Sequence, residues 1–212
     1  MFKPLWSKDI GMFAINRPIE KSCHHKTKFC ESTCYNNKLY AAFGHAMNPK
    51  DILDENAWQE NNSSELARTL SRKRNQTKRV RLMSRGEAFA DLNDIDRVEN
   101  ILKDNPDSIF WIPTRSWRNS ILWSQVDRLR DYDNVRILAS MDPSNTAEDW
   151  QQISDLKLST MFYGDDNLKT TPIGEKFFKC PKTWKHLTGH CGICKAGCFK
   201  SNKPVNVYLK QH

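Results

Sequence analysis

The sequence predicts an α/β protein, namely a partial (open) parallel β/α barrel followed by a cysteine-rich metal-binding segment. Between residues 80 and 163, short apolar runs alternate with segments of helical periodicity, as in successive β/α units. The apolar runs are continuous, which is typical of strands covered on both faces. A closed eight-unit barrel needs roughly 200 residues for itself, so an open sheet is the expected form. The predicted domains are residues 1–170, the partial barrel, and residues 171–212, the cysteine-rich segment.

The individual elements follow from the same patterns. We expect strands at 12–17, 80–84, 108–113, 135–140 and 158–163, and amphipathic helices at 91–102, 119–130 and 146–157. Residues 36–46 are expected to be helical at their start, and residues 48–75 are predicted to be mostly helical from Pro49 onward, with an interruption at 61–64. Residues 1–11 are expected to be irregular, and 205–209 is a candidate for one more strand.

The chain is basic, with a net charge of +8 and a pI near 9.1, which favours nucleic acid or another polyanion as a partner. The densest basic run, residues 72–79, is either the solvated end of a helix or a phosphate-binding surface. Arg115 and Arg118 flank Trp117 and could hold a phosphate or a base, or simply pack a loop. The candidate nucleic-acid residues are Arg72, Lys73, Arg74, Lys78, Arg79, Arg115 and Arg118.

The sequence lacks a run of eighteen apolar residues, and its first residues lack the apolar core of a signal peptide. We therefore expect no membrane partner and a cytoplasmic location. In that compartment thiols stay reduced, so the seven cysteines are expected to be metal ligands rather than disulfides. They fall in two tight groups, one between residues 23 and 34 and the other between residues 180 and 198.

The first group, Cys23, Cys30 and Cys34, follows the first predicted strand. Three thiolates can hold a metal centre and leave one coordination position open, as in a [4Fe–4S] cluster with an open iron. The alternatives are zinc with a histidine as fourth ligand, or simple free thiols. The candidate histidines are His24, His25 and His45.

The second group supplies four thiolates, enough to close a tetrahedral Zn2+ site or to hold all corners of a second [4Fe–4S] cluster. Its members are Cys180, Cys191, Cys194 and Cys198. The spacing of these cysteines is compatible with either metal centre.

Polar residues follow each predicted strand, and ligands gather at the carboxyl ends of parallel strands. The loops concerned are the three-cysteine loop, 84–88, 114–118, 140–143 and 164–166. We expect these loops to share one rim of the sheet. A soft-ligand metal centre and a Gly-Glu turn would then lie side by side.

This combination resembles the radical S-adenosylmethionine superfamily. The resemblance implies that the three cysteines hold a [4Fe–4S] cluster and that Gly86 and Glu87 meet the amino group of S-adenosylmethionine, while Ser140 meets its ribose. It also implies that a reductant supplies one electron and that a 5′-deoxyadenosyl radical modifies a substrate. The chain departs from the usual motif in its wider cysteine spacing, in Arg85 at the first glycine of the turn, and in Ala88 where proline is common.

The chain also resembles a family of small bacteriophage proteins of the gene-eighty-eight type. The shared features are the loop from Cys23 to Tyr35, the strand ends Ser84-Arg85-Gly86 and Pro113-Thr114-Arg115, and Cys191-Gly192-Ile193-Cys194. This resemblance implies a phage origin and hence the host cytoplasm. The alternative to an enzyme is a non-catalytic phage protein that binds nucleic acid or a host protein. In that case bound metal would hold its fold together.

Overall fold

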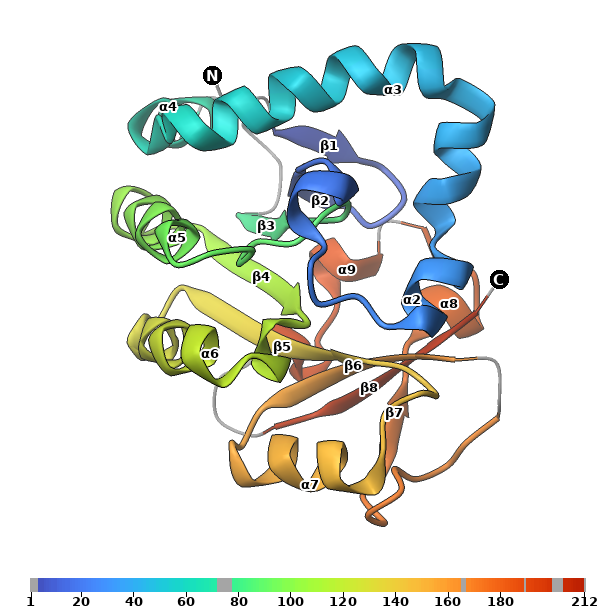
Figure 1. Cartoon of the computed structure of the whole chain (residues 1–212). Helices are drawn as coiled ribbons and strands as arrows, with labels where there is room; N and C mark the ends of the chain where they lie inside the picture. Colours follow the sequence, from blue (N-terminus) through green and yellow to red (C-terminus); the bar gives the residue numbers. More distant parts are fainter. Residues whose placement is uncertain (1–3, 72–77, 165–166, 189, 200–203, 212) are drawn as a thin grey trace.

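The computed structural model describes residues 4–71, 78–164, 167–188, 190–199 and 204–211, and one mixed sheet forms its centre (Figure 1). The strands are β1 (Leu5–Ser7), β2 (Met12–Ile15), β3 (Arg79–Leu82), β4 (Ile109–Thr114), β5 (Val135–Met141), β6 (Ser159–Gly164), β7 (Phe177–Lys179) and β8 (Asn206–Lys210). Their spatial order is β1-β2-β3-β4-β5-β6-β8-β7. β1 and β2 are antiparallel, and the other neighbouring pairs are parallel. Over the described residues the sheet is open, so the predicted parallel α/β architecture is confirmed, whereas a barrel is not.

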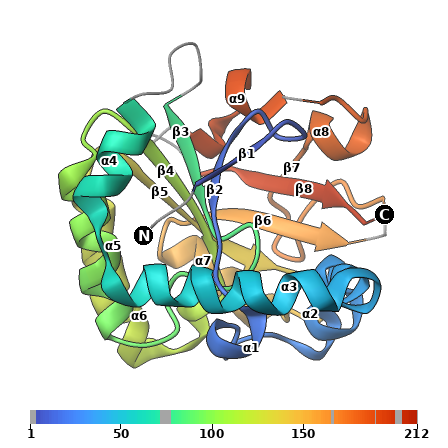
Figure 2. The ribbon, with the colours of Figure 1, turned by 90° about the horizontal axis from the view of Figure 1, so that it is seen from above.

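Helices connect the strands and cover the sheet. The α-helices are α1 (Ile19–Ser22), α2 (Lys28–Thr33), α3 (Tyr35–Glu60), α4 (Ser63–Ser71), α5 (Asn93–Asp104), α6 (Ser120–Val126), α7 (Ala147–Asp155), α8 (Pro181–Trp184) and α9 (His190–Ile193). Three short 3-10 helices are η1 (Ser116–Arg118), η2 (Asp127–Asp131) and η3 (Gly197–Phe199). Figure 2 shows α5 and α6 on one side of the strands and α8 and α9 on the other. Among the helices described, none is both long and apolar enough to cross a bilayer.

Side chains alternate between the two faces of the sheet, because successive residues of a strand point in opposite directions. On one face, Val80 and Phe110 join the main core together with apolar residues of α5, α6 and α7. On the other face, Trp111 and Leu138 form a smaller core with Phe199 of the C-terminal segment. We call this second face the inner face. It is the face on which the C-terminal cysteines lie.

The five predicted strands are present as β2 to β6, and the strand expected in the tail is present as β8. β1 and β7 were missed because each has only three residues, too few for a periodic pattern to be recognised. The predicted helix start at Pro49 is wrong, because α3 begins at Tyr35 and continues across a kink at Phe43. The predicted interruption is confirmed, since Asn61 adopts a left-handed conformation and ends α3.

Candidate functional site

A cavity of about 280 Å3 lies at the carboxyl ends of the parallel strands, and the three N-terminal cysteines line it. Residues from the ends of β3, β4 and β5 and from the loops that follow them line the same cavity. The residues predicted for this rim that line it are Cys23, Cys30, Cys34, Gly86, Glu87, Arg115 and Ser140. The cysteine trio and the Gly86–Glu87 turn therefore lie side by side.

Side chains on the inner face of the sheet form another part of the cavity wall. Arg81 of β3, Pro113 of β4, Met161 and Tyr163 of β6, and Leu209 of β8 line it. Most of these side chains are apolar, and three of the five come from β6 and β8 rather than from the loops. The cavity thus combines a polar rim of thiols, turns and an arginine with a largely apolar wall, a composition typical of small-molecule sites.

Each cysteine of the trio stands at a helix boundary. Cys23 ends α1, and its backbone N–H donates to the carbonyl oxygen of Ile19 at 2.9 Å. Thr27 caps α2, because its hydroxyl accepts a hydrogen bond from the backbone N–H of Cys30 at 2.9 Å. Cys34 is the last residue before α3 begins. The two short helices α1 and α2 therefore fold the loop so that three thiols line one cavity.

Gly86 fixes the turn after β3 against the start of the cysteine loop. Its φ angle is +85°, and a Cβ atom there would lie 2.6 Å from the carbonyl oxygen of Arg17 and 2.8 Å from Ser22 Oγ. The next residue, Glu87, donates its backbone N–H to Ser22 Oγ at 2.9 Å. Only glycine allows this combination of backbone angle and close approach.

The carboxylate of Glu87 is buried and ties the rim loops together. Oε1 accepts from the backbone N–H of Ala88 at 2.8 Å, and Oε2 accepts from that of Arg115 at 2.9 Å. Burial raises the pKa of Glu87 against the opposing effect of these hydrogen bonds. Burial, and then the nearby Glu87, raise the pKa of the Cys23 thiol to about 12. In this structure the side chain of Glu87 bridges two loops, next to the first thiol of the trio.

Asp142, directly after β5, joins the cysteine loop to the loop after β4. Its Oδ2 accepts from Thr27 Oγ1 at 2.6 Å and lies 2.9 Å from Nη1 of Arg115. Burial alone would raise the pKa of Asp142, but Ser144, Thr27 and Arg115 together hold it below its ordinary value. Burial raises the pKa of Cys30, while the charge of Arg115 and a hydrogen bond from its side chain act in the opposite direction. Arg115 is thus the cation that lies beside both the thiol and Asp142.

A buried ion-pair network supports the base of the cysteine loop. Arg17 Nη1 lies 2.7 Å from Asp94 Oδ2, and its Nη2 lies 3.0 Å from Glu55 Oε1. Trp58 Nε1 donates to the other oxygen of Asp94 at 2.6 Å. Sequence reasoning missed this network, although a charged residue directly after an apolar strand was an available signal. The network links α3 and α5 to Arg17, which lies between β2 and α1.

His25 also lines the cavity. Its Nε2 atom is buried and has no hydrogen-bond partner among the described residues. Burial, followed by the neighbouring charges of His24 and Arg118, lowers the pKa of His25. A neutral imidazole with an unpaired nitrogen is chemically suited to bind a metal.

The four C-terminal cysteines lie elsewhere, in and around α8, α9 and η3 on the inner face. They do not line the cavity at the carboxyl ends of the strands. Within the ranges that the structure describes, no three His, Cys, Asp or Glu side chains form a ready-made metal-binding group. The seven cysteines, all of which the structure describes, are therefore not arranged as ready-made metal sites.

The predicted nucleic-acid residues lie in different surroundings. Arg72, Lys73 and Arg74 are outside the described residues. Lys78 is exposed and lies 3.3 Å from Asp107, and Arg118 lies 3.6 Å from Asp149. Arg79 instead donates hydrogen bonds to the carbonyl oxygens of Cys191 and Cys194, and Arg115 lies at the cavity. The described members of this set do not form one continuous basic surface.

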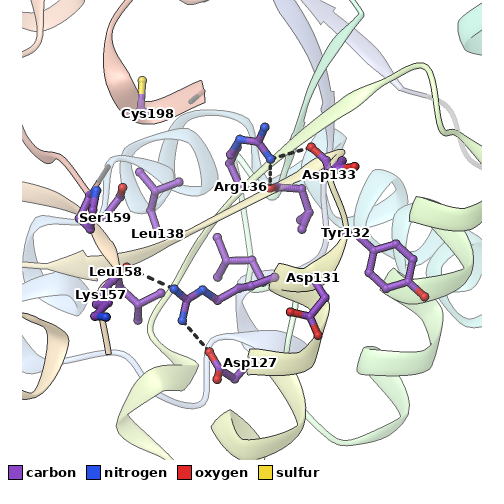
Figure 3. A pocket seen from close by; sticks show the side chains of 14 residues that line it. Asp127, Asp131, Tyr132, Asp133, Arg136, Leu138, Lys157, Leu158, Ser159 and Cys198 are labelled. Atoms are coloured by element: carbon purple, nitrogen blue, oxygen red, sulfur yellow. Dashed lines mark hydrogen bonds and ion pairs between the residues drawn. The ribbon is translucent and has the colours of Figure 1, made fainter. Parts of the chain in front are cut away.

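A second cavity, of about 380 Å3, lies near the amino ends of β5 and β6 (Figure 3). Its charged side chains are largely engaged, since Arg130 pairs with Asp127 at 2.7 Å and Arg136 donates to the carbonyl oxygen of Asp133 at 2.7 Å. Cys198 reaches its edge from the C-terminal segment. Because parallel α/β sheets bind ligands at the opposite end, the thiol-lined cavity is the better candidate site.

Comparisons with known proteins agree with one of the two resemblances. Neither a curated protein nor a solved structure matches the chain significantly. The model of the family described as Gene product 88 matches residues 6–204, nearly the whole chain. The matched region includes both cysteine groups and strands β2 to β7, together with Trp6 and Ser7 of β1, but not β8. The chain therefore belongs to the Gene product 88 family.

Proposed function

We propose that this chain is a phage-encoded iron–sulfur protein of the radical S-adenosylmethionine type. Cys23, Cys30 and Cys34 would hold a [4Fe–4S] cluster at the cavity. The observation that carries the proposal is that three thiols, and no fourth, line one cavity with the Gly86–Glu87 turn. Three thiolates around such a cluster leave one iron open to a small molecule in the cavity.

The donor set fits this cofactor. Thiolates are the usual ligands of iron–sulfur clusters, and Cys23 has both Cys30 and Cys34 as electrostatic neighbours. When bound and reduced by one electron, the cluster would supply the means to cleave S-adenosylmethionine to a 5′-deoxyadenosyl radical. The protein itself would contribute position, charge and exclusion of water.

The residues around the cavity have distinct parts in this proposal. Arg115 donates a hydrogen bond to Cys30, which stabilises the thiolate form that a cluster requires. Ser140 lines the inner wall, where its hydroxyl can bind a ribose. Met161 and Leu209 provide apolar surface that keeps water away from a bound cofactor. The carboxyl group of Glu87 lies at the cavity, where it can accept a hydrogen bond from the amino group of S-adenosylmethionine.

The test is to reconstitute the protein with iron and sulfide under anaerobic conditions and add S-adenosylmethionine and dithionite. The expected product is 5′-deoxyadenosine, detected by mass spectrometry. Cys30→Ala should abolish it, whereas Glu31→Gln, which changes an exposed side chain of the same loop, should retain it. A fully loaded cluster that yields no 5′-deoxyadenosine would contradict cofactor cleavage.

A second candidate function is favoured by His25. Its buried, unpaired Nε2 lines the cavity beside the three thiols, and three cysteines with one histidine form a closed structural zinc site. The chain would then be a non-catalytic protein that binds nucleic acid or a host protein. In that case His25→Ala should release one zinc from the purified protein, and RNA or DNA retention should fall linearly on a log–log plot against salt. An iron-loaded protein that keeps its cluster in His25→Ala excludes this alternative.

A further inference from the structure

The four C-terminal cysteines converge on the inner face of the sheet. Cys180 precedes α8, Cys191 lies in α9, and Cys198 lies in η3, with Cys194 between the last two elements. Cys198 has the other three thiols as electrostatic neighbours, and Cys191 has Cys180 and Cys194. Thiols from three separate short helices therefore share one small region.

The backbone around these thiols is held firmly against the sheet. Arg79 Nη1 donates to the carbonyl oxygens of Cys191 at 2.7 Å and Cys194 at 2.9 Å. The backbone N–H of Gly192 donates to the carbonyl oxygen of Ile10 at 3.0 Å. A Cβ atom on Gly192 would overlap the carbonyl oxygen of Gly11, so the two backbones are in direct contact. This close docking fixes the turn between Cys191 and Cys194.

A backbone N–H group also points at one of the sulfur atoms. The backbone N–H of Ala196 donates to Cys194 Sγ at 3.3 Å. The carbonyl oxygen of the same residue, Cys194, accepts from Arg79. Both the backbone and the sulfur of Cys194 are therefore held in place.

One layer of side chains separates this region from the cavity. Met161 lines the cavity and also packs in the small core with Cys191 and Cys198. Arg81 lines the cavity and is an electrostatic neighbour of Cys191. The guanidinium of Arg81 lies 5.0 Å from the ring centre of Trp111, which holds it on the inner face. The C-terminal thiols thus lie directly behind the cavity wall.

We infer that Cys180, Cys191, Cys194 and Cys198 together bind a second metal centre behind the wall formed by Arg81 and Met161. The ligand is a thiophilic metal, either Zn2+ or an iron–sulfur cluster, held by four thiolates. This centre fastens the C-terminal segment to the inner face and so completes the cavity wall. The inference goes beyond the proposed function and does not depend on the chemistry of the first site.

The test uses the full chain with Cys23, Cys30 and Cys34 all changed to Ser, so that only the second site can bind metal. After purification from iron- and zinc-supplemented cells, we expect about one zinc or about four irons per chain. Visible absorption typical of a cluster identifies iron–sulfur, and its absence with stoichiometric zinc identifies Zn2+. Adding Cys198→Ser should remove the metal. A folded triple variant that holds neither metal overturns the inference.

Hydrogen exchange provides a readout that does not require a folded cysteine variant. A chelator strong enough to remove the metal from the wild-type protein should speed exchange of the Gly192 N–H, whose acceptor lies at Ile10. Exchange in α5, on the opposite face, should stay unchanged. Metal removal that leaves Gly192 as protected as before would also overturn the inference. Loss of 5′-deoxyadenosine formation alone would affect only the proposed function.

Discussion

The two cysteine groups are built in opposite ways. The N-terminal trio lies in a loop whose supports are charged and buried, with Arg17 and Asp94 below it and Arg115 and Asp142 beside it. The C-terminal group lies among apolar side chains such as Phe199, and Arg79 and Arg136 donate hydrogen bonds to backbone carbonyl oxygens of its segment. The first group opens onto a cavity, whereas the second packs behind the cavity wall.

This difference indicates that the two cysteine groups have different roles. Buried ion pairs are weak stabilisers compared with apolar packing, but they fix position when every partner is present. Such a setting suits a loop that must hold three thiols toward a ligand. Apolar packing and direct backbone contact suit a segment that keeps one fixed position against the sheet.

The contrast is tested most strongly by replacing the arginine of each region. Arg17→Met leaves Glu55 without its cation and Asp94 with Arg97 alone, and should lower the free energy of unfolding by about 3–5 kcal/mol. Arg79→Met leaves only backbone carbonyls short of a donor and should cost about 1–3 kcal/mol. Urea unfolding of both variants measures the difference. Equal losses of unfolding free energy in the two variants would show that the charged support of the first region and the apolar support of the second do not differ.

Two glycines offer a second comparison. Gly86→Ala combines a positive φ with a close approach to Arg17 and should cost about 1–3 kcal/mol and loosen the cysteine loop. Gly174→Ala is the matched control, because its φ is also +85° but it has open space around it. Thermal unfolding should therefore show a larger loss for Gly86→Ala. If both substitutions cost the same, the contact between the turn and the loop is unimportant.

The charge of Asp142 predicts a pH dependence that the C-terminal region should lack. The pKa of Asp142 lies below its ordinary value of 3.8, so its stabilising effect is present above that value and is lost as the pH falls through the folded-state pKa. Asp142→Asn should cost about 1.5–3 kcal/mol at neutral pH. The difference in the free energy of unfolding between wild type and Asp142→Asn should become smaller as the pH falls. A gap that stays constant with pH would show that the ion pair with Arg115 contributes nothing.

The smallest effect is expected at the solvent-exposed side of the cysteine loop. Lys26 and Glu31 form an ion pair of 2.7 Å, with more than two fifths of each side chain exposed. Glu31→Gln should therefore change the free energy of unfolding by no more than about 1 kcal/mol. Metal content should be unaffected. A large loss of stability or of metal content would mean that surface charge, rather than the buried network, positions the thiols.

Much of this architecture could be predicted from local sequence patterns. Continuous apolar runs identified β2 to β6, and the loops at their carboxyl ends placed the trio beside Gly86, because parallel strands share one rim. The patterns could not reveal partners that are distant in sequence. Arg17 finds Asp94 and Glu55, and Arg79 finds Cys191, only after the chain has folded. The short edge strands β1 and β7 were missed for a different reason, because three residues are too few to show the alternating apolar pattern of a strand.

The roles of single residues were also harder to predict than their positions. Gly86 was expected to meet a ligand, and it also touches the backbone before the cysteine loop. Arg79 was grouped with the basic run, but its side chain contacts the C-terminal segment. The sequence gives the positions of charged residues along the chain. The partners of each charged side chain depend on its burial and orientation in the folded protein.

The most direct test of the central claim is iron and acid-labile sulfide analysis of anaerobically purified wild-type protein and Cys30→Ala. The account predicts that the wild type holds about four more irons and four more sulfides per chain than the variant. The variant should remain folded, because Cys30 is only partly buried. Wild-type protein that contains zinc and no iron, or equal iron in the two proteins, would contradict the account.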